Sequence, residues 1–121
     1  MMNAVRYIYF TDDMKGMTAF YRDVLGMAVK PPKEGMGYDE AEFIQLMAGN
    51  FEIALHKAGK PGLDGRNRNK LVFYCDDVAA ERERLIAKGV KFGKFDPAPG
   101  AKLVLADFKD PDGNALQLSN R

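Results

Sequence analysis

Short runs of alternating apolar and polar residues follow one another along the chain in two similar series. Residues 5–10 and 71–75 are rich in β-branched and aromatic side chains, which is typical of strands. Each of these runs ends at an Asp-Asp pair, where a carboxylate can cap the free N–H groups of a helix and meet its positive end. We therefore expect a strand and then a helix at the start of each series, with the helices beginning near Asp13 and Asp77.

The two predicted helices differ in their patterns. Apolar residues recur at spacings of three and four in the first, which makes one stripe that faces a core before Gly26 ends the helix. These residues are Met14, Met17, Phe20, Tyr21, Val24 and Leu25. The second helix runs from Val78 to Gly89 and has a polar, charged outer face. We read the stripe as core and the charges as a solvated surface.

Three further strands are expected after each helix, so each series reads β-α-β-β-β. They are residues 27–30, 42–47 and 51–57 in the first series, and residues 90–95, 102–106 and 115–119 in the second. Turn-forming triplets with glycine occur in both series, at residues 48–50 and 112–114.

The two series are copies of one unit. The Asp-Asp pairs and the turn glycines repeat with the same offset of 64 residues (76 − 12 and 113 − 49). We expect a single α+β domain over residues 1–121, made of a first module at 1–58, a linker loop at 59–69 and a second module at 70–121. The linker is rich in Gly, Asn and charge and has little to bury.

Composition narrows the classes of function. Eighteen basic residues face seventeen acidic ones and are spread along the chain, which argues against nucleic-acid binding. The apolar runs are strand-sized, far short of the roughly 20 residues of a membrane helix, so no membrane association is expected. The single cysteine, Cys75, excludes an intramolecular disulfide and fits a reducing cytoplasm; its apolar run predicts a buried structural thiol.

Two local strings carry a family resemblance. Residues 20–26, Phe-Tyr-Arg-Asp-Val-Leu-Gly, look like the FYxxxLG helix end of the vicinal oxygen chelate superfamily, which includes glyoxalases, bleomycin resistance proteins and extradiol dioxygenases. Residues 110–114, Asp-Pro-Asp-Gly-Asn, look like its DPDGN hairpin. The resemblance implies two βαβββ modules that curl a mixed sheet around a cup. It also implies a homodimer and, in the metal-dependent members, a divalent ion on the cup face.

The positions that correspond to metal ligands are degenerate in this chain. The resemblance places them at Arg6, Lys70, Gln117 and Ala54, with Glu52 and Ile53 as alternatives to Ala54. Arg and Lys offer only hydrogen-bond donors at neutral pH, and Gln offers at best a weak carbonyl ligand. We therefore expect neither a bound metal nor another cofactor.

Strand alternation assigns a set of side chains to the cup face, and these are the expected ligand contacts: Arg6, Ile8, Phe10, Glu52, His56, Lys70, Tyr74 and Gln117. Apolar walls with a few polar groups are typical of a small-molecule pocket, and Arg6 with Lys70 would favour an anionic, amphipathic ligand. The alternative is that Arg6 or Lys70 pairs with Glu52 and fills the space of the lost metal. His56 is either an ordinary strand-end histidine or an acid, base or ligand contact.

Three functional hypotheses follow. The first is a metal-independent small-molecule binding protein, used in resistance or sequestration, as the bleomycin resistance branch implies. The second is a metal-dependent glyoxalase, lyase or dioxygenase-type enzyme with non-standard ligands, which requires that Glu52, His56 and Gln117 converge. The third is an interaction module with a closed cup.

Overall fold

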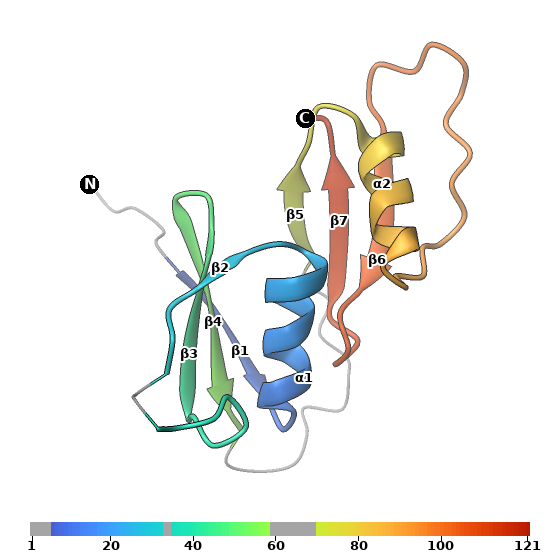
Figure 1. Cartoon of the computed structure of the whole chain (residues 1–121). Helices are drawn as coiled ribbons and strands as arrows, with labels where there is room; N and C mark the ends of the chain where they lie inside the picture. The colour runs from blue at the N-terminus through green and yellow to red at the C-terminus, as the bar shows by residue number, and fades with distance from the viewer. Residues whose placement is uncertain (1–5, 33–34, 59–69) are drawn as a thin grey trace. The chain divides into compact units, whose positions relative to one another are not determined.

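The structure is a computed structural model that describes residues 6–32, 35–58 and 70–121. The chain divides into two compact units, Met1–Gly62 and Leu63–Arg121, and each is considered by itself (Figure 1). The predicted linker, residues 59–69, lies outside the described residues. Both units combine a small sheet with a helix, so the predicted α+β class is confirmed.

The first unit is a four-stranded mixed sheet with one helical segment. The strand order is β1-β4-β3-β2, in which β1 is parallel to β4 and the other neighbours are antiparallel. The elements are β1 (Arg6–Thr11), α1 (Met14–Ala19), the π-helical turn η1 (Phe20–Val24), β2 (Ala28–Val29), β3 (Phe43–Ala48) and β4 (Phe51–Lys57).

The first helical segment begins and ends where the sequence predicts. The Asp13 carboxylate accepts a hydrogen bond from the backbone N–H of Gly16 at 2.9 Å, which caps α1. The hydrogen-bond spacing widens at Phe20, where the carbonyl accepts from the N–H of Leu25 at 3.0 Å. Gly26 then takes a φ of +78°, a conformation that favours glycine, and the segment stops.

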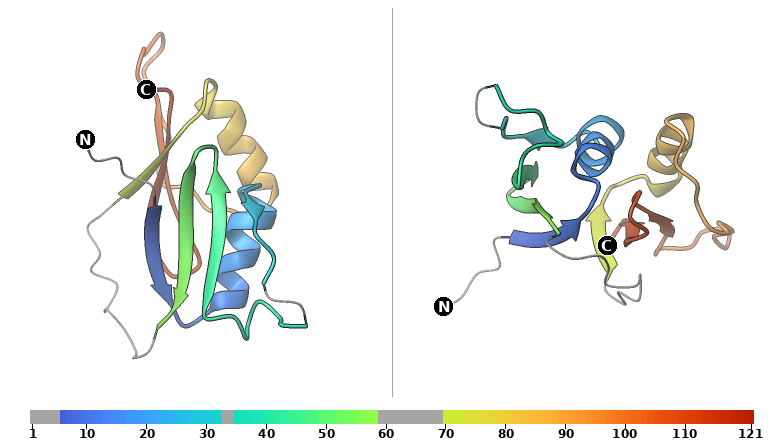
Figure 2. Two further views of the ribbon diagram at one scale, coloured as in Figure 1. Left: turned by 90° about the vertical axis from the view of Figure 1, so that its left-hand side faces the viewer. Right: turned by 90° about the horizontal axis from the view of Figure 1, so that it is seen from below.

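Alternation along the strands gives the first sheet a buried face and an open face. Ile53 and Leu55 are fully buried beneath the helical segment, together with Met17 and Tyr21. On the opposite side of the sheet Ile8 is 41% exposed and Phe10 is 60% exposed. The helix covers one face of its sheet only (Figure 2).

The second unit has three strands and one helix. Its sheet order is β5-β7-β6, with β5 parallel to β7 and β6 antiparallel to it. The elements are β5 (Lys70–Tyr74), α2 (Val78–Ala87), β6 (Leu105–Lys109) and β7 (Ala115–Ser119). The Asp77 carboxylate caps α2 by accepting from the N–H of Ala80 at 3.0 Å. Gly89, with a φ of +93°, follows the helix end as predicted.

Two of the strands predicted for this unit were wrong. The run 90–95 contributes only a single bridge, between Phe92 and Phe108. The guanidinium carbon of Arg82 on α2 lies 5.5 Å from the Phe92 ring centroid and 4.7 Å from that of Phe95, so the run packs against the helix instead of entering the sheet.

The other error concerns the run 102–106, whose strand begins three residues late, at Leu105. The Asn120 side chain accepts a hydrogen bond from the N–H of Val104 and donates one to the carbonyl of Lys102, both at 3.0 Å. These bonds satisfy the backbone there without a neighbouring strand.

The β6-β7 turn is held by Asp110, which is 5% exposed. Its Oδ1 accepts from the backbone N–H groups of Asp112 and Asn114, each at 2.9 Å, and its Oδ2 accepts from the Asn114 side chain at 2.7 Å. Gly113 supplies the positive φ, +83°, that the turn requires. The hairpin predicted from the DPDGN string is therefore confirmed.

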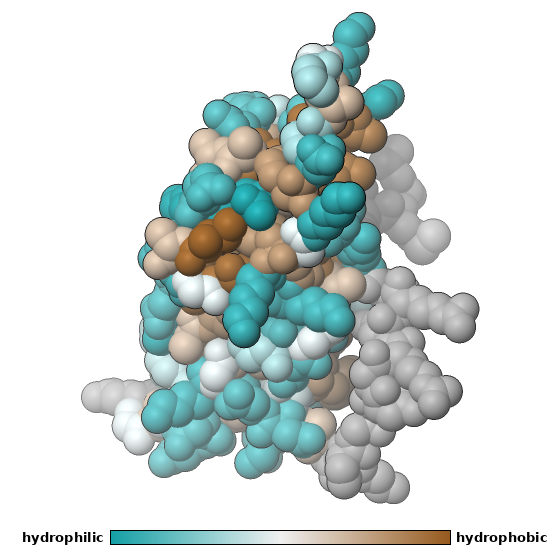
Figure 3. All heavy atoms as spheres, turned by 90° about the vertical axis from the view of Figure 1, so that its right-hand side faces the viewer, coloured by the Kyte–Doolittle hydropathy of each residue, from teal (hydrophilic) through white to brown (hydrophobic). Residues whose placement is uncertain are grey.

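The side of the molecule that carries α2 shows mostly hydrophilic spheres, with hydrophobic ones gathered in the upper half of the view (Figure 3). None of the described helices is long and apolar enough to cross a membrane.

Cys75 is half-buried, not buried as predicted. Its partial burial, together with nearby carboxylates, raises the pKa of its thiol.

Candidate functional site

The uncovered side of the first sheet, which we call the first open face, presents three rows of side chains across β1, β4 and β3. The register gives the rows Arg6, Glu52 and Met47; Ile8, Ala54 and Gln45; and Phe10, His56 and Phe43. All five predicted contacts of this unit therefore share one face. Ala54 pairs with Ile8 as Gln117 pairs with Val72 in the second unit, so Ala54, and not Glu52 or Ile53, corresponds to Gln117.

The first row is an ion pair with an amide partner. Arg6 donates from Nε to the Glu52 carboxylate, and Gln45 donates from Nε2 to its other oxygen at 2.9 Å. The Arg6 side chain is 41% exposed, whereas that of Glu52 is 12% exposed. The hydrogen bond from Arg6, aided by Gln45 and opposed by burial, holds the pKa of Glu52 below its usual value. The expected pairing of Arg6 with Glu52 is thus present.

The Arg6–Glu52 pair makes stability sensitive to acid. Because the pKa of Glu52 is lowered in the folded chain, the carboxylate stabilises the fold above its ordinary pKa of 4.5. This contribution disappears as the pH falls through the lower folded value. We expect Arg6→Met to lose about 1 kcal/mol or less at pH 7, since the pair is partly exposed, and to lose less stability than the parent chain on acidification.

Urea unfolding at neutral pH and at several values below 4.5 measures this difference. Lys15→Met, which removes an exposed cation from α1, serves as the control and should keep the acid response of the parent chain. An unchanged acid response in Arg6→Met would contradict the assignment of the pair.

The third row is aromatic and exposed to solvent. The His56 ring lies between two phenylalanines, with centroid distances of 5.1 Å to Phe10 and 6.0 Å to Phe43. Phe10 is 60% exposed and Phe43 is 41% exposed. Clustered exposed aromatic side chains are typical of surfaces that bind a ligand or a partner.

The uncovered side of the second sheet, the second open face, repeats this plan. Its rows are Lys70, Ala115 and Lys109; Val72, Gln117 and Asp107; and Tyr74, Ser119 and Leu105. Lys70 donates to Asp107 at 2.9 Å, and Gln117 donates to the same oxygen at 2.8 Å. The hydrogen bond from Lys70 is the main cause of a lowered pKa at Asp107. Lys70 therefore pairs with Asp107, within its own unit.

Sequence reasoning missed Asp107 because the strand that carries it was placed too early. The predicted run stopped at Ala106, one residue before it, whereas the observed strand continues to Lys109. Counting back from the Asp110 hairpin would have put Asp107 opposite Gln117.

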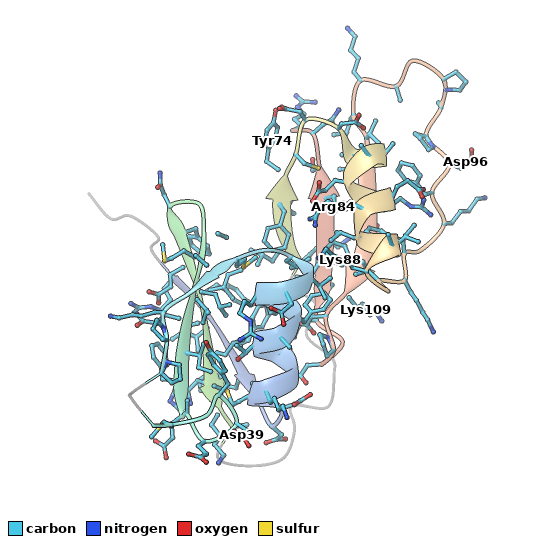
Figure 4. The ribbon with its side chains drawn as sticks, in the orientation of Figure 1. Asp39, Tyr74, Arg84, Lys88, Asp96 and Lys109 are labelled. Atoms are coloured by element: carbon cyan, nitrogen blue, oxygen red, sulfur yellow. The ribbon has the colours of Figure 1, made fainter. Side chains whose placement is uncertain are left out.

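Tyr74 lies at the end of β5 and is 66% exposed (Figure 4). Its hydroxyl donates to the carboxylate of Asp76, and this hydrogen bond raises the pKa of Tyr74. With Val72 and Leu105, which are also exposed, it forms the apolar part of the second open face.

The side chains at the ligand positions do not fit a divalent cation within either unit. Arg6 and Lys70 are cationic donors, and the carboxylates beside them, Glu52 and Asp107, are already paired with them. Glu52 and His56 share one face of β4, whereas Gln117 belongs to the second unit. Within residues 6–32, 35–58 and 70–121, no three His, Cys, Asp or Glu side chains come together as a metal-holding group.

Comparison with known proteins places this geometry in a family. Residues 3–118 match the model of the Glyoxalase/Bleomycin resistance protein/Dioxygenase superfamily. A probable chloroplastic lactoylglutathione lyase of Arabidopsis thaliana is 27% identical over 127 residues, which covers 94% of this chain and 34% of that protein. The chain thus spans about a third of the length of this curated relative.

Solved structures show the same fold. A structure from the mobile metagenome of V. Pseudocholerae is 26% identical, with a TM-score of 0.70 over 98% of this chain and 94% of its own. TnmS3, an antibiotic binding protein from Streptomyces sp. CB03234, is 21% identical, with a TM-score of 0.73 over the same shares. Because the family model matches nearly the whole chain, the chain belongs to the Glyoxalase/Bleomycin resistance protein/Dioxygenase superfamily.

Proposed function

We propose that this protein binds a small molecule on its open sheet faces without a metal ion, in resistance or sequestration. The observation that carries the proposal is the pairing of Arg6 with Glu52 and of Lys70 with Asp107. In each unit, the carboxylate that a metal ion would need as a ligand is already paired with a cationic side chain. Beside each pair the same face exposes apolar side chains, Phe10 and Phe43 in one unit and Val72 and Tyr74 in the other.

The family match supports a role in binding small molecules. The neighbour TnmS3 is described as an antibiotic binding protein, and an amphipathic face with aromatic side chains suits a ligand of that kind. We further propose that residues 1–121 act as one domain of two modules, 1–58 and 70–121, joined at 59–69, that the protein works in the cytoplasm, and that it forms a homodimer.

An enzymatic role is the second candidate, because a curated relative is named as a probable lactoylglutathione lyase. Such a role would need a carboxylate released from its ion pair, and Glu52 is held by both Arg6 and Gln45. Breaking a pair of this kind leaves an uncompensated charge in a partly buried position.

Metal content tests the choice between the two candidates. We expect the purified chain to retain no zinc, nickel, manganese or iron(II), and its melting temperature to stay unchanged when these ions are added. Mass spectrometry measures the first and thermal unfolding the second. Stoichiometric metal with a raised melting temperature would overturn the proposal and favour the enzyme, because a ligand of the folded state must stabilise it.

Ligand binding is tested with a panel of aromatic compounds in a thermal unfolding assay. A compound present at 100 times its Kd stabilises the fold by about 2.7 kcal/mol, which is readily measured. Phe10→Ala should reduce the effect, and Lys15→Ala, on the far side of the first unit's sheet, should not. If no compound raises the melting temperature, the binding proposal fails.

A further inference from the structure

We propose that Nε2 of His56 accepts a hydrogen bond from the hydroxyl of a phenolic ligand, whose ring packs against Phe10 and Phe43. The inference rests on the proposed binding function and names its ligand class. It follows from the tautomer of His56, from the side chains that flank its ring and from the position of the cations on the first open face.

The tautomer is determined by a backbone carbonyl. Nδ1 of His56 lies 2.8 Å from the carbonyl oxygen of Lys57. A carbonyl oxygen can only accept, so Nδ1 must carry the proton. In the neutral ring the lone pair is then on Nε2, and the described residues offer Nε2 no hydrogen-bond donor.

The ring of His56 has mainly apolar neighbours. Phe10 and Phe43 stand on either side of it in the same row, and the adjacent row contributes Ile8, Ala54 and Gln45. The amide nitrogen of Gln45 is directed at Glu52. A purely apolar ligand on this row would remove water from Nε2 and leave the acceptor unsatisfied, at a cost of about 1–3 kcal/mol. A ring that bears a hydroxyl avoids that loss, because its O–H donates to Nε2 while its faces contact the phenylalanines.

Charge on this face argues for a neutral phenol and against a carboxylate. Two cations act on this face, and both are directed at Glu52: Arg6 donates to its carboxylate, and Lys30, which follows β2, lies opposite Gln45 and acts electrostatically on the same group. Lys57 alternates onto the opposite side of β4 from His56. A carboxylate on the aromatic row would therefore meet a lone pair at Nε2 with no available cation in that row.

Three matched probes test the inference: naphthol, its methyl ether and naphthoate, each titrated into the intact chain at pH 7 by calorimetry. The methyl ether keeps the ring and loses the donor, and naphthoate replaces the donor with an anion. We expect naphthol to bind about tenfold more tightly than the methyl ether, as one net hydrogen bond allows. Naphthoate should bind no better than the ether.

The decisive variant is His56→Phe, which keeps an aromatic ring in the row and removes the acceptor. The naphthol preference should fall to about twofold or less, while the methyl ether binds at least as tightly as before. Lys57→Ala keeps the backbone carbonyl and should behave as the parent chain does. Circular dichroism and the melting temperature establish that each variant is folded.

The outcomes separate this inference from the function on which it rests. Equal binding of naphthol and its ether, tighter binding of naphthoate, or a preference that survives in His56→Phe would overturn the phenol assignment and leave the binding face intact. Binding of none of the three probes would also overturn it, and the wider aromatic panel decides the binding function separately. Nitrogen spectra of the imidazole give an independent measurement, since naphthol should shift the Nε2 signal and leave the Nδ1 signal nearly unchanged.

Discussion

Ile53→Ala is expected to lower the free energy of unfolding by about 2–5 kcal/mol, whereas Ile8→Ala should lower it by less than about 1 kcal/mol. Both isoleucines lie in the first sheet, on neighbouring strands. Ile53 is fully buried beneath the helix, and Ile8 is 41% exposed on the open face. The same deletion therefore creates a cavity at one position and removes little packing at the other.

Urea unfolding of the two variants measures the difference in the free energy of unfolding. Both variants replace isoleucine by alanine in a strand, so the change in intrinsic strand preference is nearly the same in each and cancels in the comparison. Similar losses at both positions would mean that the open face is covered in solution. In that case the exposed aromatic row would be part of an interface and not a free binding surface.

Asp110→Ala is expected to lower the free energy of unfolding by about 2–3 kcal/mol. The nearly buried carboxylate satisfies two backbone N–H groups and the Asn114 amide in the β6-β7 turn. Alanine leaves these donors without their acceptor, and the turn that aligns Asp107 with Gln117 loses its internal support.

Two further variants calibrate this loss. Asp110→Asn keeps one acceptor oxygen and should fall between alanine and the parent chain. Asp96→Ala removes an exposed carboxylate from the long segment between α2 and β6 and should stay within about 0.5 kcal/mol of the parent (Figure 4). Equal effects of Asp110→Ala and Asp96→Ala in urea unfolding would show that the turn does not depend on its carboxylate.

The parts of the fold that sequence reasoning predicted correctly are specified by local chemistry. The carboxylates of Asp13 and Asp77 mark helix starts, and Gly26 and Gly89 follow helix ends with positive φ, because capping depends on residues a few positions apart. The strands 51–57 and 115–119 were correct to the residue, since each follows directly on a turn signal. Because the two series repeat, the same local signals predicted elements in both units.

The errors arose where distant side chains compete with strand formation. The run 90–95 has the composition of a strand, but Arg82, eight or more residues earlier in the chain, draws Phe92 and Phe95 onto α2. The start of β6 is set by Asn120, which follows Val104 by 16 residues in the chain. No periodicity within the run itself contains this information.

The candidate site was predictable only in part. Strand alternation correctly put Arg6, Glu52 and His56 on one face, because period-two geometry is local. The partner of Lys70 and the tautomer of His56 depend on which atoms meet across strands, and no residue pattern specifies them. The ligand contacts themselves remain predictions that the binding experiments will test.

The parallel pairing of β1 with β4 has a consequence for synthesis on the ribosome. Arg6 and Glu52 are 46 residues apart, so β1 emerges well before the strand it must join. At translation rates of about 5–20 residues per second, β1 remains unpaired for roughly 2–9 seconds, with its apolar side chains exposed. The second unit repeats the delay, because β5 pairs with the last strand, β7. Newly made chains therefore pass twice through an aggregation-prone state, and slower translation of either half should lower the yield of soluble protein.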